Sequence, residues 1–168
     1  MSGAKEVAVK RARGDDGAAL VEFAIVVPFL FLVVFGIIEF GWAFSQNLDV
    51  RHGAREGSRL AAVNYRPVVA NSGNAQVADI ISEVCARIDD PEGTTITLQI
   101  PTQTIAPGGA IGDAGQRALV SISKPLDTLT GFLDFALGGK TLTSDVQVRL
   151  EVKSTWSTDN ATHTGTCS

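Results

Sequence analysis

Apolar residues follow one another almost without interruption from Ala18 to Phe44, where only Glu22 and Glu39 carry charge. A membrane-spanning helix needs about 20 such residues at ~1.5 Å each, so this segment is long enough to cross a bilayer. Pro28 would remove a backbone hydrogen bond from a soluble helix, but a membrane helix tolerates the resulting kink. The alternative, a buried core helix, would have to be unusually long and apolar on every side.

The pattern becomes two-sided between Ser45 and Val63. Basic residues recur every fourth position and form one stripe: Arg51, Arg55 and Arg59. Small residues recur in the same way on roughly the opposite side: Gly53, Gly57 and Ala61. This pattern predicts a helix that leaves the membrane, solvated on one side and able to approach another helix closely on the other. Because glycine disfavours helix by about 1 kcal/mol, a frayed connector is the alternative.

Beyond Pro67 the composition is that of a small soluble domain. After a turn at residues 71–74, apolar residues share one face of an amphipathic helix that Asp89-Asp90-Pro91 ends: Val77, Ile80, Ile81, Val84, Cys85 and Ile88. Three segments are predicted as strands: Thr94–Ile100, Ala118–Ser123 and Thr141–Trp156. A loop is expected over Pro101–Gly115, a second helix over Pro125–Leu137, and a loose polar tail from Ser157.

These elements predict an α+β fold in four parts. Residues 1–17 form a cytoplasmic leader, 18–44 a transmembrane helix, 45–64 an amphipathic extension of that helix, and 65–168 an extracytoplasmic domain. In this domain a helix is expected to cover a short antiparallel sheet.

The composition limits the kinds of binding or catalytic site that can be expected. The net charge of −4 gives no basic surface for nucleic acid. With two histidines and two distant cysteines, a metal site is not expected. Cys85 and Cys167 are either a disulfide, if this part of the chain leaves the cytoplasm, or two free thiols. The sequence contains no catalytic motif, so neither an enzyme nor a cofactor is expected.

The glutamates of the apolar segment need an explanation, because a carboxylate at the bilayer centre costs roughly 2.5–3.5 kcal/mol. If a protease cut between Gly17 and Ala18, the new ammonium group and Glu22 would lie along the first helical turn. Two helices staggered along their axes could then pair the ammonium of one with Glu22 of the next. Glu39 lies ~25 Å further along an ideal helix, near the outer interface with Trp42, and either reaches headgroup water or contacts another subunit.

The residues around the supposed cut match a known family. Gly17, four residues and Glu22-Phe23 resemble the prepilin-peptidase site of Flp-type pilins. The longer run "RGDDGAALVEFAIVVPFLFLVVFGIIEFG", followed by "GAREGSRLAAV", resembles the TadE-like pseudopilins of tight-adherence (Tad) pilus systems. The ending "SDVQVRLE" is loosely similar to the last strand of such proteins.

This resemblance implies a minor, non-enzymatic component of pilus assembly, processed by a prepilin peptidase. Its implied partners are the major Flp-type pilin, other pseudopilins, the assembly machinery and membrane lipid. The cationic residues before Gly17 place the N-terminus in the cytoplasm, with a single span in the inner membrane and the C-terminal domain outside or in the pilus.

Two alternatives remain. A signal peptidase cut after Ala43-Phe44-Ser45 would release a soluble protein beginning at Gln46, although the apolar run is about twice the usual ~7–15 residues. The chain could also be a single-pass anchored protein of unrelated function, with the Gly17 motif a coincidence.

Overall fold

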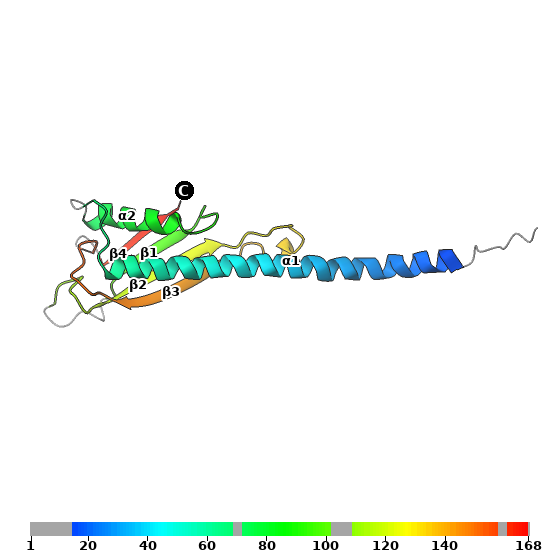
Figure 1. The fold of residues 1–168 in the computed structure, drawn as a ribbon, viewed down its shortest axis with the longest axis horizontal. Helices are drawn as coiled ribbons and strands as arrows, with labels where there is room; N and C mark the ends of the chain where they lie inside the picture. The colour runs from blue at the N-terminus through cyan, green and yellow to red at the C-terminus, as the bar shows by residue number, and fades with distance from the viewer. Residues whose placement is uncertain (1–14, 69–71, 102–108, 158–160, 168) are drawn as a thin grey trace, which may run out of the picture. The chain divides into compact units, whose positions relative to one another are not determined.

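The computed structural model describes residues 15–68, 72–101, 109–157 and 161–167 (Figure 1). In chain order its elements are α1 (Asp15–Ala62), α2 (Gly73–Cys85), β1 (Thr95–Gln99), β2 (Arg117–Pro125), α3 (Asp134–Leu137), β3 (Thr141–Arg149) and β4 (Thr162–Thr166). The chain forms two compact units, Met1–Ile38 and Glu39–Ser168, so α1 belongs to both. The predicted α+β class is confirmed.

In the first unit, α1 exposes large apolar side chains around its whole circumference, from Leu20 to Ile38. Pro28 lies inside the helix, which continues through it. Among the described residues, α1 is the one helix long and apolar enough to cross a membrane, with a mean hydropathy of 2.8 over an 18-residue window that is not buried. Such an unburied apolar surface is typical of a membrane helix.

The second unit is built on a four-stranded sheet in the order β3-β2-β1-β4. All three pairings are antiparallel, with Val120 opposite Val146, Ile96 opposite Ile122, and Leu98 opposite His163. Buried residues alternate along β1 and β2, so each strand turns one face to the core and the other toward solvent.

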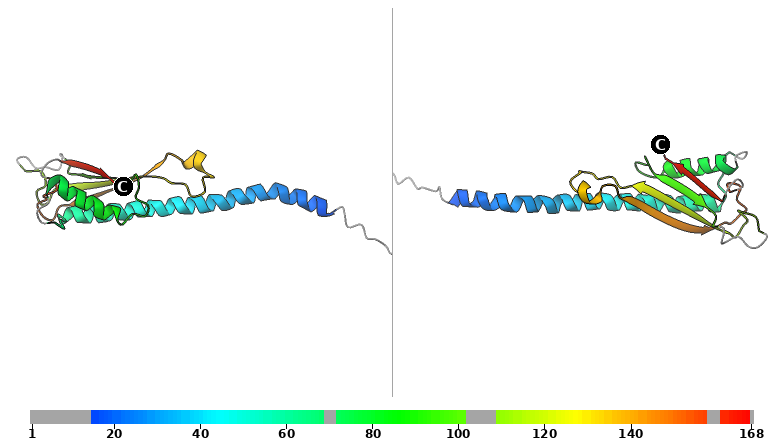
Figure 2. Two further views of the ribbon diagram at one scale, coloured as in Figure 1. Left: turned by 90° about the horizontal axis from the view of Figure 1, so that it is seen from above. Right: turned by 180° about the vertical axis from the view of Figure 1, so that it is seen from behind.

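The core lies between this sheet and two helices on the same face, α2 and the part of α1 from Glu39 onward (Figure 2). It is made of aliphatic residues from both helices and both central strands, together with Leu150 and Trp156. The part of α1 predicted as an amphipathic extension contributes to this core, because Val50, Ala54 and Leu60 are buried in it.

α1 ends at Ala62, and the chain turns directly after it. Asn64 adopts a positive φ of 54°, and Tyr65 N donates to Leu60 O at 2.9 Å. The Asn64 side chain then accepts hydrogen bonds from Gln76 Nε2 at 2.9 Å and from Thr155 N at 2.8 Å. This amide thus joins the end of α1 to α2 and to the segment after β3.

The predicted helix over Pro125–Leu137 is wrong. Pro125 ends β2, and only Asp134–Leu137 is helical. Leu126 N donates to Lys140 O at 2.8 Å, which closes the segment into a loop between β2 and β3, and Gly131 has a positive φ of 71°. The helical spacing was misleading because the apolar residues of this loop include exposed ones rather than a buried face.

The end of the chain also differs from the expectation. The strand predicted to continue to Trp156 ends at Arg149. Leu150 N still donates to Gln116 O at 2.8 Å, and the chain turns away from the sheet after it. The polar tail predicted to be loose contains β4, which pairs with β1 through a run rich in threonine. Trp156 is fully buried and donates from Nε1 to Ala61 O at 3.1 Å.

Candidate functional site

The predicted processing residues lie at the exposed beginning of α1. Gly17, Ala18, Glu22 and Phe23 are all exposed and helical. A Cβ added at Gly17 would meet no other atom within 4 Å, so the surroundings of the Gly17–Ala18 bond are open. Residues 1–14 of the predicted leader lie outside the described residues.

The small-residue stripe of α1 faces the core. Gly53, Gly57 and Ala61 are buried, whereas Arg51, Arg55 and Arg59 are exposed on the other side. A Cβ at Gly53 would lie 2.9 Å from Ile88 Cδ1, and one at Gly57 would lie 3.2 Å from both Val84 and Val120. The close approach predicted for these positions therefore occurs within the chain, against α2, the turn after it and β2.

Glu56 joins the solvated side of α1 to α2. Its carboxylate accepts hydrogen bonds from Arg59 at 2.7 Å and from Arg87, just beyond α2, at 2.6 Å. Arg87 also contacts Glu83 at 2.7 Å. The hydrogen bond from Arg59 lowers the pKa of Glu56 most, and the charges of both arginines act in the same direction, whereas partial burial opposes them. The Glu56 carboxylate is thus stabilised in its ionised form.

Glu39 has hydrogen-bond partners within its own unit, an arrangement that neither expected alternative, headgroup water or another subunit, had included. Its side chain is only 1% exposed. One carboxylate oxygen accepts from Leu129 N at 2.9 Å, and the other accepts from Thr130 N at 3.1 Å and Thr130 Oγ1 at 2.7 Å. A carboxylate that receives three hydrogen bonds is well satisfied in a buried place.

Gln46 makes a second attachment to the same loop. Its Nε2 donates to Asp127 O at 2.7 Å, and its Oε1 accepts from Asp127 N at 3.1 Å. Gln46 follows Glu39 by seven residues, which places both side chains on one face of the helix. We call the two side chains with their loop partners at Asp127, Leu129 and Thr130 the loop clasp.

The sequence does not predict the loop clasp. Glu39 was recognised as unusual, but the partner segment lies about 90 residues later in the chain and carries no motif. The seven-residue spacing of Glu39 and Gln46 was the available signal, because two buried polar groups on one helix face need partners on a common neighbour.

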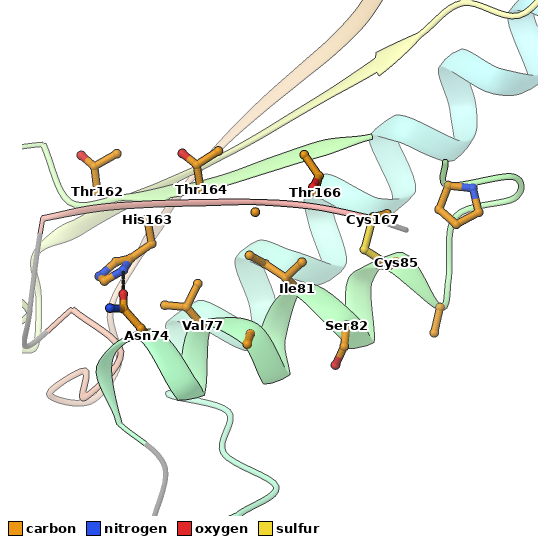
Figure 3. A pocket seen from close by; sticks show the side chains of 14 residues that line it. Asn74, Val77, Ile81, Ser82, Cys85, Thr162, His163, Thr164, Thr166 and Cys167 are labelled. Atoms are coloured by element: carbon orange, nitrogen blue, oxygen red, sulfur yellow. Dashed lines mark hydrogen bonds between the residues drawn. A yellow bond between two sulfur atoms is a disulfide. The ribbon is translucent and has the colours of Figure 1, made fainter. Parts of the chain in front are cut away.

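A groove of about 820 Å³ lies between α2 and β4 (Figure 3). Val77 and Ile81 line it from the helix, and Gly165 allows close approach of the strand, since a Cβ there would lie 2.7 Å from Ile81 Cδ1. At one end His163 Nδ1 and Asn74 Oδ1 are 2.9 Å apart. No group of three or more His, Cys, Asp or Glu in the described part of the chain is arranged to hold a metal.

The other end of the groove is closed by a disulfide between Cys85 and Cys167, whose Cα atoms are 5.7 Å apart. Cys85 is the last residue of α2, and Cys167 follows β4 directly. The disulfide therefore ties the edge strand and the end of the chain to the helix, and Cys167 N also donates to Thr94 O at 2.9 Å.

These features define a class of protein: one candidate membrane helix whose second half forms part of the core of a small α+β domain. The family model described as TadE-like protein matches residues 17–59, which confirms the resemblance seen in the sequence. The chain is therefore similar to TadE-like proteins over most of α1, from Gly17 to Arg59. No curated protein and no solved structure matches the chain.

Proposed function

We propose that the protein is a TadE-like pseudopilin: a minor, membrane-anchored component of Tad pilus assembly that a prepilin peptidase cuts between Gly17 and Ala18. Its N-terminus lies in the cytoplasm, its span in the inner membrane, and its α+β domain outside the cytoplasm. Its partners are the major Flp-type pilin, other pseudopilins and the assembly machinery. The protein acts by assembly and not by catalysis.

The observation that carries this proposal is the position of the family match, which begins at Gly17 and continues to Arg59. The match thus includes the proposed cut, Glu22 and the helix that enters the domain. After the cut, the Ala18 ammonium group and the exposed Glu22 are the charged groups at the beginning of an otherwise apolar helix. Pairing between staggered neighbours removes the cost of leaving either charge alone in lipid.

Two further observations support the proposed orientation. Lysine and arginine precede the apolar segment, and cytoplasmic flanks are enriched in these residues. The disulfide between Cys85 and Cys167 is of a kind that persists in oxidising compartments.

The loop clasp argues against release by signal peptidase. Residues 43–45 lie within the continuous helix α1, and Gln46 follows them directly. A cut after Ser45 would remove Glu39 and leave the backbone N–H groups of Leu129 and Thr130 without their acceptor. The domain would thus lose the three hydrogen bonds from Glu39 that hold this loop to α1.

The N-terminus of the protein extracted from membranes of its own host tests the proposal. Edman sequencing or intact mass should show a chain that begins at Ala18. A chain that begins at Gln46 would instead support the signal peptide, and one that begins at Met1 or Ser2 would support the plain anchor. Gly17→Leu should leave the leader attached, because the small residue at the cut is lost.

Substitution of Glu22 tests the pairing between subunits. Glu22→Ala should leave membrane insertion intact, since it removes a charge from the apolar segment, but it should weaken crosslinking to neighbouring pilin helices. Gly36→Ala is the matched control, because Gly36 lies on the same helix with no atom within 4 Å of an added Cβ. Equal crosslinking in the wild type, Glu22→Ala and Gly36→Ala would contradict the pairing.

A further inference from the structure

The β2–β3 loop, Leu126–Lys140, exposes an unusual amount of apolar surface. Leu129 is 54% exposed, Phe132 46% and Phe135 87%. Three large apolar side chains on one short loop are more than the scattered apolar residues of an ordinary soluble surface, and such groups mark an interaction site.

The loop clasp determines where this apolar loop is held. Glu39 and Gln46 together make five hydrogen bonds to the loop residues Asp127, Leu129 and Thr130. Because both side chains are almost completely buried, the attachment is shielded from water, and the loop is fixed to positions 39–46 of α1.

Positions 39–46 are where the apolar surface of α1 ends. Phe40, Trp42 and Phe44 are exposed, and the next three residues, Ser45 to Asn47, are polar. Tryptophan is enriched at the level of lipid headgroups, so the helix surface between Phe40 and Phe44 marks the membrane boundary. The loop is therefore attached at the height at which a bilayer around α1 would end.

The charges of the loop fit an interfacial position rather than a deep one. Thr128 Oγ1 donates to Asp134 Oδ1 at 2.9 Å, and Lys140 is exposed at the end of the loop. These groups would remain at headgroup level, while the neighbouring Phe132 and Phe135 have apolar rings able to enter the boundary with the acyl chains. Interfacial segments combine polar and apolar groups in this way.

We propose that the β2–β3 loop is a second membrane contact, in which Leu129, Phe132 and Phe135 insert into the headgroup region of the bilayer that α1 crosses. Glu39 acts as the positioning residue, because its hydrogen bonds hold the loop against the helix at the membrane surface. The contact restrains the domain relative to the bilayer at two points instead of one. It requires α1 to span the membrane but does not depend on cleavage at Gly17.

Fluorescence quenching in single-copy nanodiscs tests this contact. Phe135→Cys in the full-length chain carries a polarity-sensitive fluorophore, and Glu151→Cys, exposed beyond the other end of β3, is the matched control. Since Cys85 and Cys167 are bonded, only the introduced thiol reacts. Lipid carrying a headgroup-level spin label should quench the fluorophore at 135 about threefold or more above that at 151, and aqueous iodide should do the reverse.

Equal iodide quenching at positions 135 and 151 would overturn the proposal. Since each disc holds one copy of the chain, that result would mean that the apolar side chains of the loop bind another protein and not lipid. Glu39→Gln combined with Phe135→Cys tests the clasp. This variant should lose at least about half of the lipid quenching, since an amide has one oxygen acceptor where the carboxylate has two. Unchanged quenching would remove Glu39 from its positioning role. The N-terminus of the same sample reports cleavage separately, so the two proposals fail independently.

Discussion

The two halves of α1 form one continuous helix with opposite kinds of surface. Up to Ile38 its apolar side chains are exposed all round, whereas from Glu39 to Ala62 it buries one side in the domain and exposes the other. The backbone is helical throughout, so the difference lies only in side chains. The same element can therefore serve two environments, the proposed lipid bilayer along its apolar half and a protein core along the rest, as long as its apolar pattern changes where the environment does.

The two glutamates of the apolar segment show the same difference on a smaller scale. Glu22 is exposed in the first half, and the proposed partner for its charge is another chain. Glu39 is buried at the start of the second half and takes three hydrogen bonds from its own chain. A carboxylate in an apolar stretch thus indicates a missing partner, but not whether that partner belongs to the same molecule.

Removal of the disulfide should give the largest difference in effect between the domain and the apolar half of α1. Cys85→Ala with Cys167→Ala opens a link between residues 82 positions apart, which should lower the free energy of unfolding of the domain by about 2–4 kcal/mol. Insertion of α1 should not change. With Trp42→Phe as the background, Trp156 is the single tryptophan, and its fluorescence in detergent follows the unfolding of the domain alone.

The matched comparison is the Trp42→Phe chain that keeps both cysteines, measured after its disulfide has been reduced. It should unfold at the same denaturant concentration as the variant with both cysteines replaced by alanine. If neither change lowers the stability of the domain, the disulfide does not constrain the unfolded chain as expected, and the attachment of β4 rests on the sheet alone.

Leucine substitutions at two glycines of α1 should give the next largest difference in domain stability. Gly53→Leu places a large side chain where a single Cβ would already lie 2.9 Å from Ile88, so the domain should lose about 2 kcal/mol of stability through overpacking. Gly36→Leu places the same side chain where no atom lies within 4 Å, and the domain should be unaffected. Denaturation followed by Trp156 fluorescence compares the two, and equal midpoints would mean that Gly53 does not pack against the core.

The sequence predicted those parts of the molecule whose pattern is regular. The all-round apolar run and the two-sided stripe from Arg51 to Ala61 follow from the periodicity of a helix. The β-branched run from Thr94 to Ile100 in the same way predicts the strand that is β1. The Gly17 motif was recognised because it is local, and the family match later began at that residue.

The rest depended on contacts between distant residues. β4 is rich in threonine and becomes a strand because β1 offers it an edge, so its own pattern was insufficient. The loop over 126–140 has apolar residues at helical spacing, but its conformation is set by the clasp to Glu39 and Gln46. Long-range hydrogen bonds of this kind leave no periodic trace in the sequence.

The smallest expected effect concerns the solvated side of α1, where Glu56 bridges Arg59 and Arg87. Because the pKa of Glu56 is lowered in the folded state, its contribution is present above the ordinary glutamate pKa and is lost as the pH falls through the lowered one. Glu56→Gln should therefore cost on the order of 0.5 kcal/mol near pH 7, since both arginines are exposed, and the difference from wild type should shrink as the pH falls through the lowered pKa. Glu92→Gln, at another exposed glutamate, is the control. If the difference in free energy of unfolding between wild type and Glu56→Gln did not change with pH, the charge of Glu56 would not stabilise the contact between α1 and α2. Packing would then be the source of that contact.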